Sequence, residues 1–223
     1  MILNNSPTVY NTGHVIGQFF KSRCDLYAYI PIPKCASKWT TKFLYDGLNW
    51  EVSTRSDKLA ELSLKKFTIL REPLDRWISG MCQYLVTYHP KTLLNARELI
   101  EFIFKRVDFD PHTTPQINYL NDLNSEDLVY FKFDNDLEKN VKSYIKYETG
   151  QEYGEPVFRN DMIEGSYKSY ASDIDHSRYY GAIGWRREKL KILLESNDDW
   201  KNSVLKYYKD DIDLYNSVQF YGK

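Results

Sequence analysis

The chain has 223 residues and balances 30 Lys and Arg against 31 Asp and Glu, which gives a formal net charge of −1. This length suits one α/β domain with a real core, and the missing basic field argues against nucleic acid or anionic lipid as a partner. No segment is apolar for long enough to span a bilayer, and the N-terminus lacks the pattern of a secretory signal, so we expect a soluble, cytoplasmic protein. The 3 cysteines form no Cys-x-x-Cys pair, which argues against a disulfide framework or a zinc site and fits a reducing compartment.

We expect a single domain over residues 1–223 that begins with an irregular arm over residues 1–22, where Asn, Pro and Gly interrupt any periodicity. An apolar run over residues 27–30 then predicts a buried strand, because aromatic and β-branched residues favour strands. Pro31 and Pro33 end this strand, since proline cannot donate a hydrogen bond to a sheet ladder.

The rest of the chain alternates between short strands and amphipathic helices. Residues 51–66 are a polar connection, and residues 148–180 are polar and irregular. The remaining predicted elements are, in chain order, a helix over 42–48, a strand over 67–71, a helix from Pro73 with Trp77, Met81 and Tyr84 on one face, a helix over 93–107, a two-proline loop over 110–116, an apolar turn over 117–120, a strand over 127–133, and helices over 137–147, 186–195 and 199–217. This alternation predicts a central parallel sheet flanked by helices, a three-layer α/β sandwich, with ligands at the carboxyl ends of the strands.

The stretch around Lys34 predicts an anion-binding loop, because it lies between the first strand and a helix. Free backbone N–H groups and the positive end of the helix dipole would face an anion such as phosphate or sulfate. Lys34 adds a mobile positive charge, and Ser37, Thr40 and Thr41 add hydroxyl donors. A Walker A loop needs a spaced glycine pair before Lys and Ser or Thr, and the sequence has no such run.

Two segments resemble the cofactor motifs of sulfotransferases that use 3′-phosphoadenosine 5′-phosphosulfate. Pro33-Lys34-Cys35-Ala36-Ser37-Lys38-Trp39 is similar to the 5′-phosphosulfate loop of that family. Thr68-Ile69-Leu70-Arg71-Glu72-Pro73-Leu74-Asp75-Arg76-Trp77-Ile78-Ser79-Gly80 is similar to its 3′-phosphate motif, in which an arginine ends a strand and a serine follows eight positions later. The resemblance implies a P-loop-like fold and a cofactor site, free of metal, that consists of Lys34, Cys35, Ala36, Ser37, Lys38, Trp39, Thr40, Arg71 and Ser79.

Three further segments resemble the carbohydrate O-sulfotransferase branch of that family. His112-Thr113-Thr114-Pro115-Gln116 resembles its His-x-x-Pro-Gln segment, and Phe133-Asp134-Asn135-Asp136-Leu137 resembles, with changes, an acidic segment that follows a strand. The stretch from Tyr207 to Tyr215 is similar to its terminal Tyr-x-x-Asp helix. The Golgi members carry a membrane anchor that we do not find in this sequence, so we expect a soluble member of bacterial or viral type.

Sulfuryl transfer is an in-line displacement like phosphoryl transfer, and positioning and charge stabilisation dominate its catalysis. We expect Lys34 to neutralise the bridging oxygen and the amides of residues 36–38 to hold the phosphate and sulfate oxygens. Arg71 offers several donors to the 3′-phosphate, but it has Glu72 and Asp75 as alternative partners.

Four side chains have competing interpretations. Trp39 either stacks on the adenine, as the resemblance implies, or packs as a core tryptophan. Ser79 either donates to the 3′-phosphate or only lets helices approach, and Cys35 is expected to be a small filler. His112 is our candidate for the general base that accepts the proton of the acceptor hydroxyl. The alternatives are a structural histidine that bonds the backbone of its loop, and a nearby carboxylate that acts as the base.

The leading hypothesis is therefore a sulfotransferase that moves a sulfuryl group from 3′-phosphoadenosine 5′-phosphosulfate to a hydroxyl-bearing acceptor, which we expect to be a carbohydrate. One alternative is a non-catalytic module that binds a nucleotide or glycan on the same fold. Another is a nucleoside phosphate kinase, which the absence of a Gly-Lys-Ser/Thr run disfavours. None of these hypotheses involves nucleic acid or a membrane.

Overall fold

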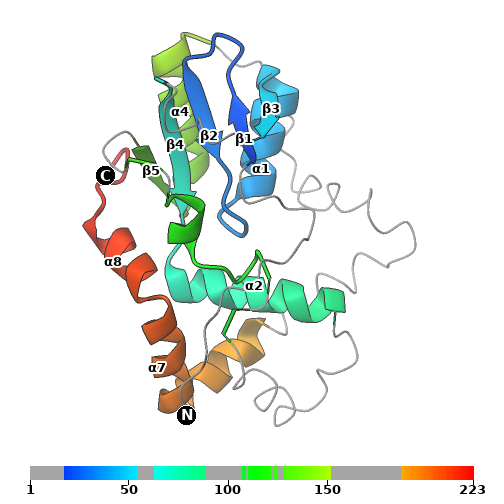
Figure 1. Ribbon diagram of the computed structural model, residues 1–223, viewed down its shortest axis with the longest axis vertical. Helices are drawn as coiled ribbons and strands as arrows, with labels where there is room; N and C mark the ends of the chain where they lie inside the picture. Colours follow the sequence, from blue (N-terminus) through cyan, green and yellow to red (C-terminus); the bar gives the residue numbers. More distant parts are fainter. Residues whose placement is uncertain are drawn as a thin grey trace.

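The computed structural model describes residues 18–54, 63–88, 107–108, 110–121, 123–124, 128–151 and 187–223 (Figure 1). The five strands within these residues form one sheet with the order β3-β1-β2-β4-β5. They are β1 (Gln18–Lys21), β2 (Tyr27–Ile30), β3 (Glu51–Thr54), β4 (Lys65–Leu70) and β5 (Leu128–Lys132). The α/β class is confirmed, and β2, β4 and β5 are the three strands that the sequence predicts.

The sheet is mixed, and of its five described strands the predicted parallel arrangement is confirmed for β2, β4 and β5. β2, β4 and β5 run parallel, whereas β1 is antiparallel to both β2 and β3. β1 also shows that the predicted arm over residues 1–22 ends earlier than expected. β1 and β2 form a hairpin. Its turn is held by the Ser22 hydroxyl, which accepts hydrogen bonds from the amides of Leu26 (3.3 Å) and Tyr27 (3.1 Å). β3 lies in the segment that was expected to be only a polar connection.

The helices follow the predicted order, with shifted boundaries. They are α1 (Ser37–Lys42), which continues as a π-helical turn η1 (Phe43–Gly47), α2 (Pro73–Tyr88), the short 3-10 helix η3 (Gln116–Tyr119), α4 (Leu137–Thr149), a helix over 187–195, α7 (Asp198–Tyr207) and α8 (Lys209–Ser217). The single helix predicted over 199–217 is two helices that join at Tyr208. The helix predicted over 93–107 lies outside the described residues apart from Val107, as does most of the irregular segment 148–180.

The hydrophobic core has two parts. The larger one covers the sheet, where the ring of Phe67 packs 5.2 Å from Tyr29 and 5.7 Å from Tyr144 of α4. The smaller one joins α2 to α7 and the helix over 187–195, and Trp77 meets Trp200 there edge to face at 5.7 Å. The predicted apolar face of α2 is therefore confirmed.

α2 lies at the end of the sheet where the predicted site residues Lys34 and Arg71 are found. The carboxyl ends of β2 and β4 point toward α2, which runs across below them in Figure 1. Among the described residues, no helix is long and apolar enough to cross a membrane.

Candidate anion-binding site

The parallel strands bring three sequence segments to one edge of the sheet. β2, β4 and β5 end at Ile30, Leu70 and Lys132, and the residues that follow them are neighbours in space. Arg71, directly after β4, donates from Nη1 to the carbonyl oxygen of Lys34 at 3.1 Å. Its guanidinium also lies over the ring of Phe133, directly after β5, at 4.5 Å from the ring centroid. The Arg71 side chain thus joins the loop after β2 to the segment after β5.

The loop between β2 and α1 has an unusual backbone. Lys34 and Ala36 both adopt the left-handed conformation, with φ of 70° and 55°, which residues with a Cβ atom rarely adopt. Such strain persists only where the surroundings hold it, and it is common at binding sites. Here Arg71 binds the Lys34 carbonyl, and Arg76 donates from Nε to the Pro33 carbonyl at 3.0 Å. The first amides of α1, which have no acceptor within the helix, begin at this loop.

The two lysines of the loop concentrate positive charge. Desolvation, and then the charges of Arg71 and Arg76, lower the pKa of Lys34 to about 8. Desolvation and the charge of Lys34 lower the pKa of Lys38 to about 8 as well, although Lys38 is the more exposed of the two and water screens it more. Among the described residues, no carboxylate forms an ion pair with the Lys34 ammonium. An anion at this loop would relieve the repulsion between these cations.

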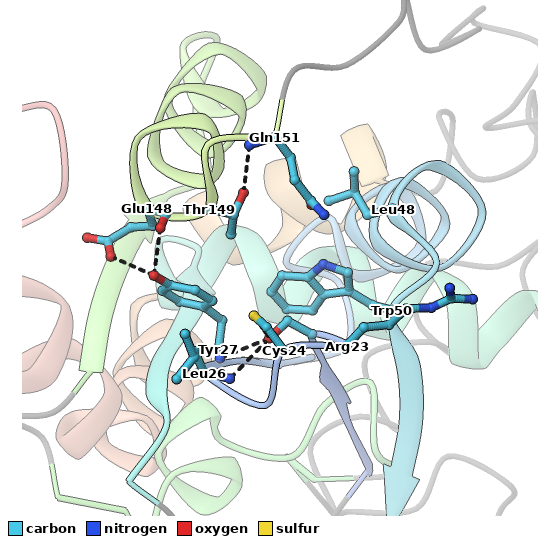
Figure 2. Close-up of a pocket in the computed structure, with 10 residues that line it drawn as sticks. Arg23, Cys24, Leu26, Tyr27, Leu48, Trp50, Glu148, Thr149 and Gln151 are labelled. Atoms are coloured by element: carbon cyan, nitrogen blue, oxygen red, sulfur yellow. Dashed lines mark hydrogen bonds between the residues drawn. The ribbon is translucent and has the colours of Figure 1, made fainter.

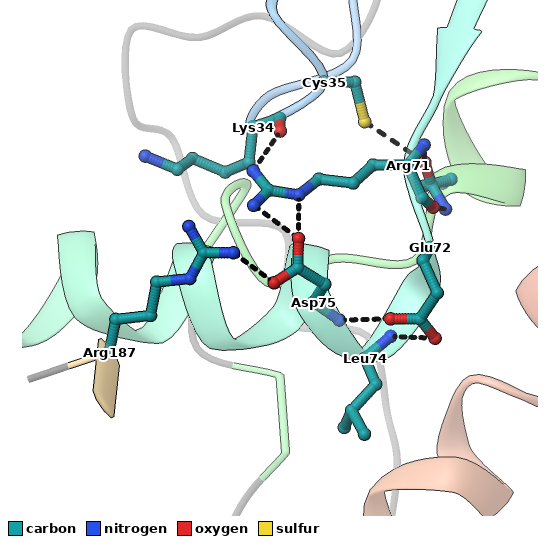
Figure 3. A network of polar contacts seen from close by, with 8 residues as sticks. Lys34, Cys35, Arg71, Glu72, Leu74, Asp75 and Arg187 are labelled. Carbon is teal, nitrogen blue, oxygen red and sulfur yellow. Dashed lines mark hydrogen bonds and ion pairs between the residues drawn. The ribbon is translucent and has the colours of Figure 1, made fainter. Parts of the chain in front are cut away.

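The Arg71 side chain already has an acidic partner, as one of our alternatives predicts. Its Nε and Nη2 atoms lie 2.7 and 2.6 Å from Asp75 Oδ2 (Figure 3). The other oxygen of Asp75 pairs with Arg187, a residue that the sequence analysis did not single out. Glu72 does not take this role, because its carboxylate accepts hydrogen bonds from the amides of Leu74 and Asp75 and so caps α2.

Ser79 and Gly80 lie further along α2. Ser79 is half-buried and follows Asp75 by one helical turn. A Cβ atom at Gly80 would lie 2.2 Å from the carbonyl oxygen of His112, so only glycine permits this close approach. The absence of a side chain at Gly80 is therefore what allows the His112 loop to lie against α2.

His112 pairs with a carboxylate rather than only with the backbone. Its Nδ1 atom lies 2.9 Å from Asp110 Oδ2, and its amide donates to Asp110 Oδ1 at 2.9 Å. In neutral histidine this contact favours the tautomer with the proton on Nδ1 and an unprotonated Nε2. Asp110 also acts on the Lys34 ammonium, because its negative charge offsets part of the lowering of the Lys34 pKa. The alternative base was an unspecified nearby carboxylate, and Asp110 is a carboxylate in direct contact with the histidine.

Gln116 joins the two proposed cofactor segments, a role that the sequence analysis missed. Its Oε1 atom accepts from the Arg71 amide (3.0 Å) and from the Cys35 thiol (3.1 Å), and its Nε2 atom donates to the Arg71 carbonyl at 2.9 Å. Asp211 of α8 holds Gln116 in turn, since its two oxygens accept from the amides of Gln116 (2.7 Å) and Ile117 (2.8 Å). All polar contacts of Gln116 take place in the interior, because the residue is wholly buried.

Arg76 is a second residue that the sequence analysis missed. It is wholly buried and donates from Nη1 to the Thr114 carbonyl at 2.7 Å, in addition to its bond to the Pro33 carbonyl. Its Nη2 atom is buried and has no hydrogen-bond partner among the residues that the structure describes. Tyr208 of the terminal segment donates its hydroxyl proton to the Thr113 carbonyl. Arg76 and Tyr208 thus fix adjacent carbonyls of one loop.

Three expected cofactor contacts have other roles in the structure. Thr40 is wholly buried and its hydroxyl donates to the Ala36 carbonyl at 3.1 Å, so this hydroxyl proton already has an acceptor within the chain, and the contact of Thr40 with a cofactor stays a prediction. Cys35 is also buried, and desolvation raises the pKa of its thiol to about 11, in agreement with a filler. Trp39 is partly buried and one face of its ring stacks on Phe43, with 5.5 Å between centroids.

A separate pocket lies at the other end of β2. It has a volume of about 320 Å³, and Tyr27, Trp50 and Glu148 are among the residues that line it (Figure 2). The Tyr27 hydroxyl donates to the Glu148 carbonyl at 2.7 Å. None of the predicted site residues lines this pocket. Within the part of the chain that the structure describes, no group of three or more His, Cys, Asp and Glu side chains is arranged to hold a metal ion.

Comparison with known proteins adds no further information about this site. The chain matches no protein-family model, no curated protein and no solved structure. The case for a function therefore depends on the residues themselves and on how the fold brings them together.

Proposed function

We propose that the chain is a sulfotransferase on a P-loop-like, three-layer α/β fold, and that it transfers a sulfuryl group from 3′-phosphoadenosine 5′-phosphosulfate to a hydroxyl of a carbohydrate acceptor. One observation carries this proposal. The five segments that resemble the family's motifs are far apart in the sequence, yet hydrogen bonds and ring contacts join them at one sheet edge. Parallel strands alone bring the segments after β2, β4 and β5 together, so the support for the proposal comes from Gln116, Asp211 and Tyr208, which join the two remaining segments to them.

The chemistry assigned to Lys34 follows from its position and charge. During transfer the bond between sulfur and the 5′-phosphate oxygen breaks, and a bond between sulfur and the acceptor oxygen forms. Negative charge grows on the oxygen that leaves, and a cation next to it stabilises the transition state. Lys34 is part of the strained loop that leads into α1. An oxygen bound at this loop would meet both the Lys34 ammonium and the first amides of α1.

The acceptor proton goes to His112 in this proposal. With Nδ1 bound to the Asp110 carboxylate, Nε2 is the basic atom, and the carboxylate stabilises the imidazolium that forms. The pair has the arrangement of a base and its orienting acid, which favours catalysis over the alternative of a purely structural histidine. The same pair disfavours the non-catalytic binding module, because nucleotide binding alone requires no general base.

Calorimetric binding tests the cofactor site. We expect 3′-phosphoadenosine 5′-phosphate to bind with a Kd on the order of 1 μM, and adenosine 5′-phosphate at least about tenfold more weakly, which corresponds to 1.4 kcal/mol. Equal affinity for the two nucleotides would exclude a 3′-phosphate site at Arg71. No binding of either would contradict the proposed function and leave the binding of a glycan as the better hypothesis.

A substitution of Lys34 tests catalysis separately from binding. Lys34→Ala should abolish transfer of labelled sulfate from the donor to a mixture of carbohydrate acceptors while it retains much of the nucleotide affinity. Lys42→Ala is the matched control, because Lys42 is the last residue of α1, the helix that follows the Lys34 loop. If Lys34→Ala and Lys42→Ala turn over equally fast, the catalytic role of Lys34 is wrong.

A further inference from the structure

Asp75 occupies the donors that the proposed function reserves for a phosphate. One of its oxygens accepts from both Nε and Nη2 of Arg71, at 2.7 and 2.6 Å, and the other pairs with Arg187 (Figure 3). Two guanidinium groups therefore share a single carboxylate, one from Arg71 directly after β4 and one from Arg187 in the helix over 187–195. The side chain of Asp75 is 38 % exposed, so water and solutes reach this carboxylate.

Arg71 does not depend on Asp75 for its position. Its Nη1 atom is bound to the Lys34 carbonyl at 3.1 Å, and its guanidinium lies over the Phe133 ring at 4.5 Å. Its backbone is held on both sides by Gln116. The guanidinium would keep its place if Asp75 were withdrawn, and its Nε and Nη2 donors would then become available.

We infer that Asp75 is an internal counter-ion that an incoming phosphate must displace from Arg71 and Arg187, and that Asp75 thereby sets the affinity of the site for 3′-phosphorylated nucleotides. This inference rests on the proposed function, because it takes the 3′-phosphate as the displacing group. Arg187 would then be a further arginine for that phosphate.

The chemistry of the two anions explains why a phosphate can displace the Asp75 carboxylate from the two arginines. A carboxylate has two oxygens and one negative charge, whereas a phosphate dianion has three free oxygens and up to two charges. Arginine binds phosphate with pairs of parallel hydrogen bonds, so a phosphate can accept from both guanidinium groups at once. A nucleotide without a 3′-phosphate leaves the Arg71–Asp75 pair intact and gains nothing at this position. Asp75 therefore acts as a specificity-determining residue.

Neutral substitutions of Asp75 test this inference by calorimetry with 3′-phosphoadenosine 5′-phosphate and adenosine 5′-phosphate. A partly exposed ion pair is typically worth up to about 1 kcal/mol, so we expect Asp75→Asn to bind the first nucleotide about fivefold more tightly than the wild type. Its affinity for the second nucleotide should not change. Asp75→Ser should behave in the same way if the Asn variant does not fold, and Asp75→Glu, which keeps the charge, should resemble the wild type.

Glu72→Gln is the matched control, since it removes a negative charge three residues from Asp75 at a carboxylate whose hydrogen bonds go to the amides of Leu74 and Asp75. An equal gain in Glu72→Gln would mean that total charge, and not displacement, explains the effect, and would overturn the inference. Unchanged or weaker binding by the neutral Asp75 variants would overturn it as well, because Asp75 would then support Arg71 instead of competing with the ligand. The failure of the proposed function is a different result: neither the wild type nor any variant would then distinguish the two nucleotides.

Discussion

The substitution of Asp211 gives the sharpest test of how the site is supported. Asp211 lies on α8, only 1 % exposed, and its carboxylate accepts from the amides of Gln116 at 2.7 Å and Ile117 at 2.8 Å. Asp211→Ala removes both acceptors at once. The Gln116 amide is then left buried without a partner, whereas the half-buried Ile117 amide can gain water.

The expected cost follows from these two hydrogen bonds. A hydrogen bond to a charged group contributes about 1.5–3 kcal/mol, so their joint loss should lower the free energy of unfolding by about 3–6 kcal/mol. Asp211→Asn keeps one acceptor oxygen and should lose about half as much. Small domains have about 5–15 kcal/mol of stability, so the Asn variant remains folded across this range, and it gives the measurement if the wild type is too close to the lower limit for Asp211→Ala to fold.

Urea unfolding followed by tryptophan fluorescence measures these differences. Asp210→Ala is the control, because Asp210 is the exposed neighbour in the same helical turn and should cost less than about 1 kcal/mol. If Asp211→Ala is no less stable than Asp210→Ala, the two hydrogen bonds contribute nothing, and the argument that α8 supports the site is wrong.

Two further predictions concern α2 and the loop. Gly80→Ala places a Cβ atom 2.2 Å from the His112 carbonyl oxygen and should lower the free energy of unfolding by at least about 2 kcal/mol. Gly47→Ala, whose Cβ would have its nearest contact at Phe43, 3.7 Å away, should be nearly neutral. Urea unfolding measures both variants, and equal stability would refute the close approach. Because the pKa of Lys34 is lowered to about 8, the lysine loses its charge as the pH rises, and the rate of sulfuryl transfer should fall by up to about tenfold between about pH 7 and 9. Lys34→Arg should flatten this dependence in a transfer assay with labelled donor, and an unchanged slope would assign the titration to another group.

The parallel half of the fold could be predicted from sequence because its strands are short apolar runs with clear ends. All four residues of β2 are buried, and Pro31 follows directly. β1 was missed because only two of its four residues, Phe19 and Phe20, are apolar, whereas all four residues of β2 form one apolar run. The antiparallel direction of β1 depends on the turn at Ser22, where the side chain accepts hydrogen bonds from two backbone amides. A pattern of apolar residues does not predict such a turn.

The candidate site also has a part that could be predicted from sequence and a part that could not. Lys34 and Arg71 could be found because each follows the carboxyl end of a predicted strand, and parallel strands bring such positions together. The partners of these residues could not, since Asp75 competes with Glu72 for Arg71 and only the course of the chain decides between them. Arg187 lies 112 positions from Asp75 in the sequence, and no local signal connects the two.

The two arginines of the motif after β4 have different functions, although the sequence presents them as similar charges. Arg76 is wholly buried, and its hydrogen bonds go to the carbonyls of Pro33 and Thr114, so it joins the two loops of the site. Arg71 binds a carbonyl with one nitrogen and an exchangeable carboxylate with two others. Arg76 and Gln116 hold the backbone of the proposed site in place without any ligand. If the site binds a phosphate as we propose, then, among the described residues, the side chain of Asp75 is the group that must move away from Arg71. Binding would then exchange one anion for another at fixed donors, and the identity of residue 75 would set how tightly the phosphate binds.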